Sequence, residues 1–535
     1  MKTKYDPKLL NEWSSNDIRY WTNFVELKDF YNRPPLYSEI EQQIREKKEN
    51  YSNRKLVCDS IKSDYSQTIL TLSQRSNLAL LEDENTFTIC IAHQPNLFGG
   101  PLYFLFKIVS GISLATTLTQ KFPSYRFVPI YYCGEEDHDF AEINHINIFN
   151  QRIEWQKEST GPVGRNTLDG ISECISQLKN ICVREKYTND FFKTLDENWS
   201  NFNNYHDFYF WFINTIFGES GLLFFSPDKK IYKYCFKEII LKELNSEFVM
   251  ATANSTISKL EKIKFDIQAR PREINLFYID QSGARVRFVK KENHFETIHG
   301  EFICTLIDIN NYVTNFPEKF NANVMLRPLY QEFLLPNIVF IGGGAEVSYW
   351  LELKDVFQHC KITYPILSRR FSGIIIDNRT IEKINSLQLQ VEDFFASNQS
   401  IKNNYIGTNS TISNSLKRVD ENIQDNFEAI GKISALINEQ LSHATKAELV
   451  KLNKEIQHIF TKLQKAEKSK YESDLQKIDK FKEQLFPNNS LQERFAAWIP
   501  YYLRYGKNLI TKMLSAYDLE DNKITVFNES QFAEI

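Results

Sequence analysis

The sequence lacks paired cysteine motifs, long apolar runs and any excess of basic charge. Its eight cysteines are scattered with no Cys-x-x-Cys spacing, which argues against a zinc ribbon or redox dithiol and suits a reducing compartment. It contains no run of about 18 apolar residues and no apolar signal core near its first residue. The formal net charge of -4 provides no general attraction for nucleic acid or anionic membrane. We therefore expect a cytoplasmic protein that binds neither nucleic acid nor membrane.

The familiar phosphate-binding motifs are also missing. Glycines cluster at two places, Gly99-Gly100 and Gly342-Gly343-Gly344. Neither cluster fits G-x-G-x-x-G or the Walker A pattern. The motifs alone therefore predict neither a dinucleotide fingerprint nor a P-loop.

The chain has enough apolar residues for a large core, and its sequence pattern changes clearly from one segment to the next. It has 535 residues, of which 42% are hydrophobic and 14% aromatic, enough for two or more structural units. The patterns predict a helical N-terminal segment over 1–86 that wraps a following α/β core over 87–380. Inserted pieces are expected at about 150–320 within that core. A helical arm over 381–485 and a C-terminal return to the core over 486–535 complete the chain.

The first strand of the core leads into a turn with polar side chains. Thr88 to Ala92 is apolar and partly β-branched, which predicts a buried strand, and a helical pattern runs from Leu102 to about Gln120. His93, Gln94 and Asn96 lie between them, beside the first glycine pair. A strand, glycine turn and helix can offer N–H groups and a positive dipole end to an anion. The alternative is an ordinary strand-to-helix connection.

An acidic loop follows the next predicted strand. The strand is Phe127 to Cys133, and Glu135, Glu136, Asp137, His138 and Asp139 come directly after it. In open α/β sheets ligands gather beyond the carboxyl ends of strands, so this loop could face the same crevice as His93. Crowded carboxylates repel one another. Some of them should therefore have raised pKa values, or hold a cation or an amine. The loop could bind a divalent ion, recognise an amino group, supply a general base, or be a solvated loop with a helix cap.

The strand, glycine turn and helix unit occurs a second time. Ile338 to Ile341 predicts a strand, the three glycines follow it, and Glu346 lies near the start of the next helix. Three glycines remove every β-carbon at the turn, so a ligand could approach the backbone closely. Arg369 and Arg370 follow a further predicted strand and could clamp phosphate or carboxylate.

Beyond Arg379 the pattern becomes helical. Apolar residues step by three or four from Leu416 to Leu441 and again from Leu449 to Phe481. This spacing predicts an antiparallel coiled-coil hairpin, with Thr445 as the N-cap of its second helix and Glu448 completing a capping box. A two-helix arm has a narrow core, so we expect it to pair with a second copy. Packing on its own domain is the alternative.

Five segments of the chain share their order and spacing with one known family. They are HQPNLFGGPLYFLFK (93–107), VPIYYCGEEDHDFAEINH (128–145), LRPLYQEFLLPNIVFIGGGAEVSYWLELK (326–354), PILSRRFSG (365–373) and LFPNNSLQERF (485–495). Together they resemble the BshC family, the cysteine-adding enzymes of bacillithiol biosynthesis. The family often has Thr at the position of Gly99 and Gly-Pro-Gly-Glu at 343–346. Loss of that proline should make the second turn more mobile.

The resemblance implies a fold and an activity. The fold would be a Rossmann-like nucleotide-binding core with inserted connecting segments, plus a long antiparallel coiled-coil arm that pairs two subunits. The reaction would join L-cysteine to the amine of glucosaminyl-malate in the last step of bacillithiol biosynthesis. The resemblance also implies an adenine nucleotide, ATP or ADP, as a cofactor. Mg²⁺ is a candidate companion of that nucleotide, and no residue is assigned as a metal ligand. His93 would correspond to the histidine that meets phosphates in the first glycine turn.

Amide formation requires an activated carboxylate, and ATP could provide an acyl-adenylate or acyl-phosphate. His93 and N–H groups near Gly99 and Gly100 would stabilise charge on phosphate oxygens. One of Asp137, His138 or Asp139 could take the proton of the amine. The other residues assigned to the nucleotide are Gln94, Asn96, Gly342, Gly343, Gly344, Glu346, Arg369 and Arg370.

Two other functions fit the same sequence. The core could be a Rossmann-like module that binds a metabolite or nucleotide, while the arm docks a partner enzyme. The protein could also be a ligase that uses a different amino sugar as acceptor.

Overall fold

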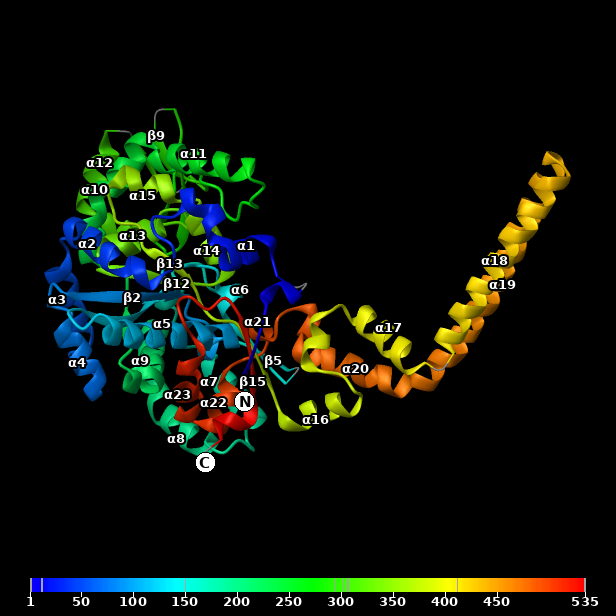
Figure 1. Ribbon diagram of the computed structural model, residues 1–535. Helices are drawn as coiled ribbons and strands as arrows, with labels where there is room; N and C mark the ends of the chain where they lie inside the picture. The colour runs from blue at the N-terminus through cyan, green and yellow to red at the C-terminus, as the bar shows by residue number, and fades with distance from the viewer. Residues whose placement is uncertain are drawn as a thin grey trace. The chain divides into compact units, whose positions relative to one another are not determined.

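The computed structural model describes residues 2–10, 13–149, 151–292, 294–300, 302–305, 307–410 and 412–533. The chain forms two compact units. The larger consists of residues 1–8, 12–375 and 491–535, and the smaller of residues 9–11 and 376–490. Figure 1 shows the elements of both.

A parallel five-stranded sheet forms the centre of the larger unit. Its strands are β2 (Thr86–His93), β3 (Arg126–Cys133), β6 (Leu223–Phe225), β12 (Asn337–Gly342) and β13 (Ile366–Arg369). Every neighbouring pair is parallel. All but the first residue of β3 and the last of β2 are buried, as expected for strands covered on both faces. The strands predicted from the apolar runs are confirmed.

The order of the strands creates a switch point. Across the sheet they run β13-β12-β2-β3-β6. The chain starts at β2, moves outward through β3 and β6, and then returns to the other side of β2 with β12 and β13. The carboxyl ends of β2 and β12 therefore flank the place where the direction of winding reverses. In open α/β sheets this place is the usual ligand crevice.

Helices cover both faces of this sheet (Figure 1). On one face lie α5 (Leu102–Lys121) and α9 (Tyr205–Phe217), and on the other α13 (Arg327–Leu334) and α14 (Gly344–Leu351). Helix α5 is long and apolar enough to cross a membrane, but 78% of its apolar window is buried in this core. Its composition is therefore that of a central core helix.

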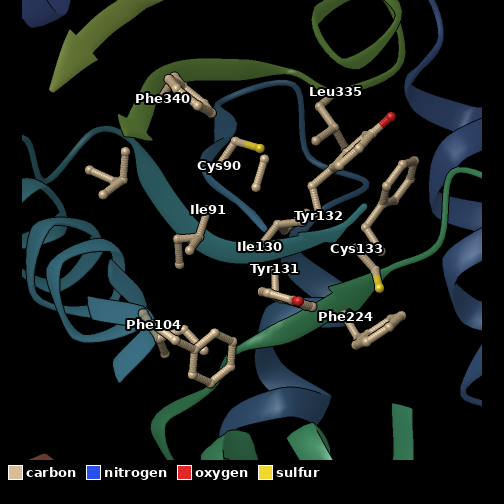
Figure 2. Close-up of a cluster of buried hydrophobic side chains, with 14 of the residues drawn as sticks. Cys90, Ile91, Phe104, Ile130, Tyr131, Tyr132, Cys133, Phe224, Leu335 and Phe340 are labelled. Atoms are coloured by element: carbon tan, nitrogen blue, oxygen red, sulfur yellow. The ribbon is translucent and has the colours of Figure 1, made fainter. Parts of the chain in front are cut away.

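Alternation along the strands directs side chains into two separate layers. Figure 2 shows Tyr131 beside Phe104 of α5, whereas Tyr132 lies with Leu335 on the opposite face. Both tyrosines are fully buried. Consecutive residues of a strand point to opposite faces, so β3 contributes to both layers.

The N-terminal segment is mostly helical, as predicted, and also contains a strand. Its elements are β1 (Lys2–Tyr5), α1 (Ser15–Asn23), α2 (Ile40–Asn50), α3 (Arg54–Asp64) and α4 (Leu72–Leu80). Helix α2 is tied to the core because the buried Lys47 ammonium donates to the backbone oxygens of Glu332 and Leu335, at 3.1 and 3.2 Å.

The region between β3 and β12 holds helices, a small hairpin and a second sheet. Its elements are α6 (Phe140–Ile143), β4 (His145–Ile148), β5 (Gln151–Glu154), α7 (Ile171–Ile181), α8 (Thr188–Asn198), α10 (Lys230–Ser246), α11 (Phe248–Lys262), β7 (Leu276–Ile279), β8 (Arg285–Lys290), β9 (His294–Thr297), β10 (Ile303–Thr305), α12 (Asp308–Asn315) and β11 (Phe320–Ala322). Strands β7 and β8 form an antiparallel hairpin with Gln281, Ser282 and Gly283 in its turn. The second sheet has the order β10-β9-β8-β7-β11. Strand β6 lies within the region predicted as inserted but belongs to the central sheet.

Two strands near the C-terminus lie outside the central sheet. The strand after Arg370 is β14 (Gly373–Ile376), which belongs to a separate sheet of order β1-β15-β14. The last strand, β15 (Ile524–Asn528), lies at the centre of this sheet. The edge partner β1 comes from the N-terminus, and the sequence of β15 carries no signal for a partner so distant in the chain. The C-terminal region also includes α15 (Lys354–Cys360), α21 (Gln492–Phe495), α22 (Ile499–Tyr505) and α23 (Lys507–Met513).

The smaller unit contains the predicted helical hairpin. Its helices are α16 (Asn378–Ser386), α17 (Asn398–Asn409), α18 (Ser413–Ile437), α19 (Glu439–Lys468) and α20 (Glu472–Leu485). The predicted N-cap at Thr445 is wrong. The turn lies at Asn438, whose side chain accepts a hydrogen bond from the Leu441 N–H at 2.7 Å. Thr445 and Glu448 lie inside α19, because an asparagine cap seven residues earlier already starts the helix.

Candidate functional site

The predicted site residues gather around the switch point. His93 ends β2, the acidic loop follows β3, and the three glycines join β12 to α14. Arg369 ends β13. The four carboxyl ends belong to neighbouring parallel strands. The sheet therefore brings these segments to one edge, as the sequence predicted.

The His93 side chain holds a buried nitrogen without a partner. Its Nε2 atom is buried and makes no hydrogen bond within the described chain. The ring packs edge-on against Tyr103, with 5.4 Å between ring centroids. Burial, helped by the nearby Lys107 ammonium, lowers the pKa of His93 to about 3. The imidazole is therefore neutral at physiological pH, and its Nε2 atom is suited to a ligand that supplies the missing hydrogen bond.

The first glycine turn is closed by its own backbone. The Gly99 N–H donates to the Asn96 oxygen at 2.8 Å, and the Gly100 N–H donates to the Leu97 oxygen at 2.9 Å. The prediction that these N–H groups face a phosphate is therefore wrong for this conformation. Glycine is needed because φ is +83° and +74°, and because a β-carbon at Gly99 would lie 2.5 Å from Trp498 Nε1. Asn96 contributes a buried, unpartnered Oδ1 atom beside this turn.

The glycines of the second turn have different constraints. A β-carbon at Gly344 would lie 2.2 Å from the Asp17 carboxylate, so the close approach there is made by the protein itself. The Gly343 N–H donates to Glu346 Oε2 at 2.8 Å, which caps helix α14. A β-carbon at Gly343 would have no neighbour closer than 3.5 Å, whereas one at Gly342 would meet Phe340 at 2.9 Å. Gly343 therefore has the open position at this turn.

Glu346 pairs with a lysine that is not among the predicted site residues. The Lys107 ammonium, almost fully buried, bonds to Glu346 Oε2 and to the Ala92 oxygen. Burial opposes ionisation of Glu346, but Lys107 and His93 lower the pKa of this carboxyl overall. Burial also lowers the pKa of Lys107. This pair places opposite charges directly at the switch point. A lysine in the middle of an apolar helix was the signal that could have found it.

The first two carboxylates of the acidic loop bind other side chains of the protein. Glu135 accepts hydrogen bonds from His206 and Ser226, and Glu136 pairs with Lys233. Burial raises the pKa of Glu136, and the carboxylate of Asp228, which lies outside the loop, raises it further against the opposing effect of Lys233. Neither glutamate is more than 8% exposed. Both anchor the loop to neighbouring elements.

Asp137 is held by three donors. Gln94 Nε2 donates to its Oδ2 atom at 2.8 Å, the His138 N–H donates to Oδ1 at 2.8 Å, and Arg285 Nη1 lies 3.3 Å from Oδ1. Burial would raise the pKa of Asp137, but contacts with His138 and Arg285 lower it below the usual range. This carboxylate is therefore a stable anion rather than a raised-pKa acid. Arg285 reaches the loop from β8, a partner that sequence spacing could not reveal.

His138 and Asp139 have distinct local roles. Arg285 Nη1 lies 2.8 Å from His138 Nδ1, closer than the 3.4 Å between that nitrogen and Asp137 Oδ1. The closer contact requires Nδ1 to accept, which places the ring proton on Nε2. Asp139 Oδ1 accepts from the Glu142 N–H and caps α6. The helix-cap alternative therefore applies to Asp139.

The two predicted arginine clamps are engaged within the protein. Arg369 donates to both carboxylate oxygens of Asp17, and Arg370 donates to Glu493 at 2.7 Å. Both arginines are at most 6% exposed. In this structure they bind carboxylates of the fold, because the N-terminal segment and the C-terminal return supply partners that the sequence pattern did not pair with them.

Across the residues that the structure describes, no group of three or more His, Cys, Asp or Glu side chains could hold a metal ion. A separate cavity of about 510 Å³ lies away from these residues. It is lined by residues of α8, α9, α22 and α23, including Phe191, Trp211, Tyr502 and Lys507.

Comparisons with known proteins agree over nearly the whole chain. A family model described as "Bacillithiol biosynthesis BshC, N-terminal Rossmann-like domain" matches residues 8–371. Another, "Bacillithiol biosynthesis BshC, C-terminal coiled-coil domain", matches residues 373–529. The predicted Rossmann-like core and coiled-coil arm are thereby confirmed.

Relatives that match over most of the chain share one name. A protein of Flavobacterium johnsoniae is 35% identical over 91% of this chain and 92% of its own length. One from Flavobacterium psychrophilum is 36% identical over 93% of each chain. Both are named "Putative cysteine ligase BshC". A solved structure titled as a putative arginyl-tRNA synthetase from Campylobacter jejuni covers 79% of this chain and 98% of its own, with 10% identity and a TM-score of 0.21, too low to support any argument.

Proposed function

Because the chain belongs to the BshC family of bacillithiol biosynthesis, we propose that it is a ligase that joins L-cysteine to the amine of glucosaminyl-malate. The observation that carries this proposal is the match to relatives named as cysteine ligases over more than 90% of both chains. The new bond would be an amide between the cysteine carboxyl carbon and the sugar nitrogen. The proposal also specifies glucosaminyl-malate as the acceptor and a nucleotide as the activating cofactor.

The chemical requirement is an activated carboxylate. Oxide is a poor leaving group at neutral pH, so the cysteine carboxylate must be activated before an amine can displace its oxygen. A bound nucleoside triphosphate would supply that activation. The observation that favours a bound ligand is the pair of buried, unpartnered atoms at the switch point: His93 Nε2, which can donate to a ligand oxygen, and Asn96 Oδ1, which can only accept from a ligand N–H or O–H. His93 would hold a ligand oxygen or hydroxyl through its orphaned nitrogen, without adding a second charge.

Two cations would provide charge complementarity. Lys107 lies beside Glu346 at the switch point, and Arg327 lies close enough to Glu346 for that carboxylate to influence its pKa. Two positive groups around one carboxylate leave a net positive charge. This excess favours an anionic ligand, since fixed charges at a partly dry site are worth more than in water.

The acidic loop would hold the amine. Asp137 remains ionised because its pKa lies below the usual range, which suits it to bind an ammonium group and makes it a weak proton acceptor. His138 is a poor general base while Arg285 occupies its Nδ1 atom. The arrangement therefore supports Asp137 as a binding group more strongly than either neighbour as a base. Mg²⁺ has no cluster of protein ligands within the described ranges, so no step is assigned to it.

The arm would pair two subunits. Many large apolar side chains on α18 and α19 are at least 41% exposed: Val419, Ile430, Ile433, Leu436, Ile437, Leu441, Val450, Leu452, Ile459 and Leu463. Leu436 is 87% exposed. A hairpin that leaves this much apolar surface in water gains stability by covering it. A homodimer joined through the arm is the proposed assembly.

The activity is tested by an end-point assay with mass-spectrometric detection. Purified protein is mixed with cysteine, glucosaminyl-malate, ATP and Mg²⁺, beside a His93→Ala variant whose folding is verified by circular dichroism. The expected result is the amide product from the wild type, its loss in the variant, and release of AMP or ADP. A folded wild type that forms no product under these conditions would count against the ATP-dependent ligase.

The exposed apolar arm also suits a second function, a metabolite-binding module that docks a partner enzyme. Light scattering coupled to size exclusion distinguishes the two. A dimer of this chain alone favours the homodimeric ligase. A monomer that co-purifies stoichiometrically with another enzyme, without turnover of its own, favours the module.

A further inference from the structure

Arg327 differs from the other arginines near the carboxyl edge of the central sheet. Three of these arginines are neutralised by carboxylates: Arg285 by Asp137, Arg369 by Asp17 and Arg370 by Glu493. For Arg327, no carboxylate of the described residues lies within 4 Å of its guanidinium. Charges in partly buried positions are normally paired. An unpaired guanidinium at this edge therefore requires an explanation.

The surroundings of Arg327 keep its charge and leave donors unused. Its Nη2 atom donates to the Tyr349 hydroxyl, and its Nη1 atom makes only a long contact of 3.4 Å with Gln331. A guanidinium has five N–H donors. Burial opposes ionisation, but Tyr349, Tyr132 and Glu346 raise the pKa of Arg327 overall. It is a permanent cation with spare donors.

Tyr349 extends the same donor set. Its oxygen accepts from Arg327 Nη2, so its own O–H remains available, and no acceptor for that O–H occurs among the described residues. On the other side, the guanidinium carbon lies 6.0 Å from the centre of the Tyr132 ring, which limits its movement. Arg327 begins α13 and Tyr349 belongs to α14. The two side chains thus come from separate helices that cover the same face of the sheet.

From this arrangement we infer that Arg327 and Tyr349 form a binding subsite for one anionic group, a carboxylate or phosphate, of a substrate. A planar oxyanion accepts two parallel hydrogen bonds from a guanidinium and a third from a phenol. The proposed function supplies three sources of such a group: the carboxylate of cysteine, the malyl carboxylates of the acceptor and the phosphates of the nucleotide. The choice of these ligands rests on the proposed function, whereas the subsite itself rests on the unpaired guanidinium.

Binding measurements test the subsite without turnover. Isothermal titration calorimetry on the full-length protein would use cysteine, glucosaminyl-malate, ATP and inorganic pyrophosphate separately. Arg327→Met keeps the length of the side chain and removes the charge. We expect it to weaken one ligand by about tenfold to a hundredfold, the effect of losing a charge-assisted hydrogen bond. Tyr349→Phe should weaken the same ligand by a smaller factor.

The pattern of losses identifies the source of the anion. If binding of ATP and pyrophosphate weakens together, the subsite holds a phosphate. If only cysteine or only glucosaminyl-malate binds more weakly, the subsite holds the carboxylate of that ligand. Arg152→Met, at a half-exposed arginine on β5 paired with Glu154, should change none of the affinities. Arg327→Lys keeps the charge without the planar fork, and should fall between the wild type and Arg327→Met.

Stability separates a binding role from a structural one. Since no carboxylate of the described residues forms an ion pair with Arg327, the Arg327→Met variant should unfold at the same or a higher temperature than the wild type in the absence of ligand. Unchanged affinity for every ligand, or a wild type that binds none of them, would overturn the subsite. A protein that binds through Arg327 but forms no amide would instead overturn the proposed reaction and leave the subsite standing.

Discussion

Arg369 donates from Nε and Nη2 to the two carboxylate oxygens of Asp17, at 2.6 and 2.8 Å, although 352 positions separate them in the chain. Its guanidinium also lies over the rings of Trp13 and Trp21, at 4.6 and 4.1 Å from their centres. This cage closes the end of β13 with the N-terminal segment. Arg369 therefore has a structural role here, whereas the sequence pattern predicted that it binds a phosphate or carboxylate of a ligand.

Asp17→Ala should destabilise the protein severely. The variant leaves the buried Arg369 guanidinium without its partner, and breaking a buried pair from one side costs about 3–5 kcal/mol. The measurement is the midpoint of urea denaturation, followed by tryptophan fluorescence, to which Trp13 and Trp21 contribute among the seven tryptophans of the chain.

A matched control is Glu219→Gln, which removes an ion pair with Lys507 in which both side chains are more than 60% exposed. Such pairs contribute about 0–1 kcal/mol. Equal midpoints for Asp17→Ala and Glu219→Gln would show that the buried pair stabilises the protein no more than the exposed pair does.

Gly343→Ala and Gly344→Ala should differ in their effect on stability. At Gly344 the new methyl group would lie 2.2 Å from the Asp17 carboxylate, so the variant should lose stability of about 2 kcal/mol or more. At Gly343 the nearest atoms are 3.5 Å away and φ is -78°, so alanine fits and stability should be unchanged or slightly higher.

The same pair of variants tests the predicted ligand contact. If the backbone at Gly343 lies against a ligand, Gly343→Ala should lose activity while its melting temperature stays that of the wild type. Full activity in Gly343→Ala would remove this position from the nucleotide-binding set.

Stability should depend on pH through His93. The folded pKa is about 3, below the value of about 6.5 expected in an unfolded chain. Above pH 6.5 both states are neutral and the ring contributes no pH dependence. Below it the unfolded state binds a proton that the folded state does not, so stability falls as the pH falls, by up to about 2 kcal/mol at pH 5.

The comparison is between the wild type and His93→Gln in urea denaturation at pH 8, 6 and 5. The loss between pH 8 and pH 5 should be smaller in the variant by the amount assigned to His93. Parallel pH profiles for the two proteins would contradict a neutral, buried imidazole.

The start of helix α19 provides a test within the arm. Asn438→Ala removes the hydrogen bond that caps the Leu441 N–H, which should cost about 1 kcal/mol. Hydrogen exchange of the full-length protein should then be about fivefold faster in the first turn of α19. Thr445→Ala, inside the helix, should leave exchange unchanged or slower, because alanine favours helix. Faster exchange in the Thr445 variant than in the Asn438 variant would restore the predicted cap.

Local pattern determined the elements of this protein and their common edge. Thr88 to Ala92 and Ile338 to Ile341 are apolar, short and followed by glycine, which is sufficient to predict strands that enter turns. Parallel strands align their carboxyl ends, so His93, Asp137 and Glu346 could be assigned to one crevice without coordinates. The stepping of apolar residues likewise predicted the helical hairpin of the arm.

Only the tertiary structure decided which charges remain free at that crevice. Arg369 and Arg370 look available in the sequence, but Asp17 and Glu493 approach them from the two ends of the chain. Arg327 lies in a segment shared with the family but was not among the predicted site residues, yet the fold leaves it without a carboxylate partner within the described part of the chain. The physical reason is that pairing depends on distances across the sheet and between helices, whereas sequence patterns encode only local periodicity and burial.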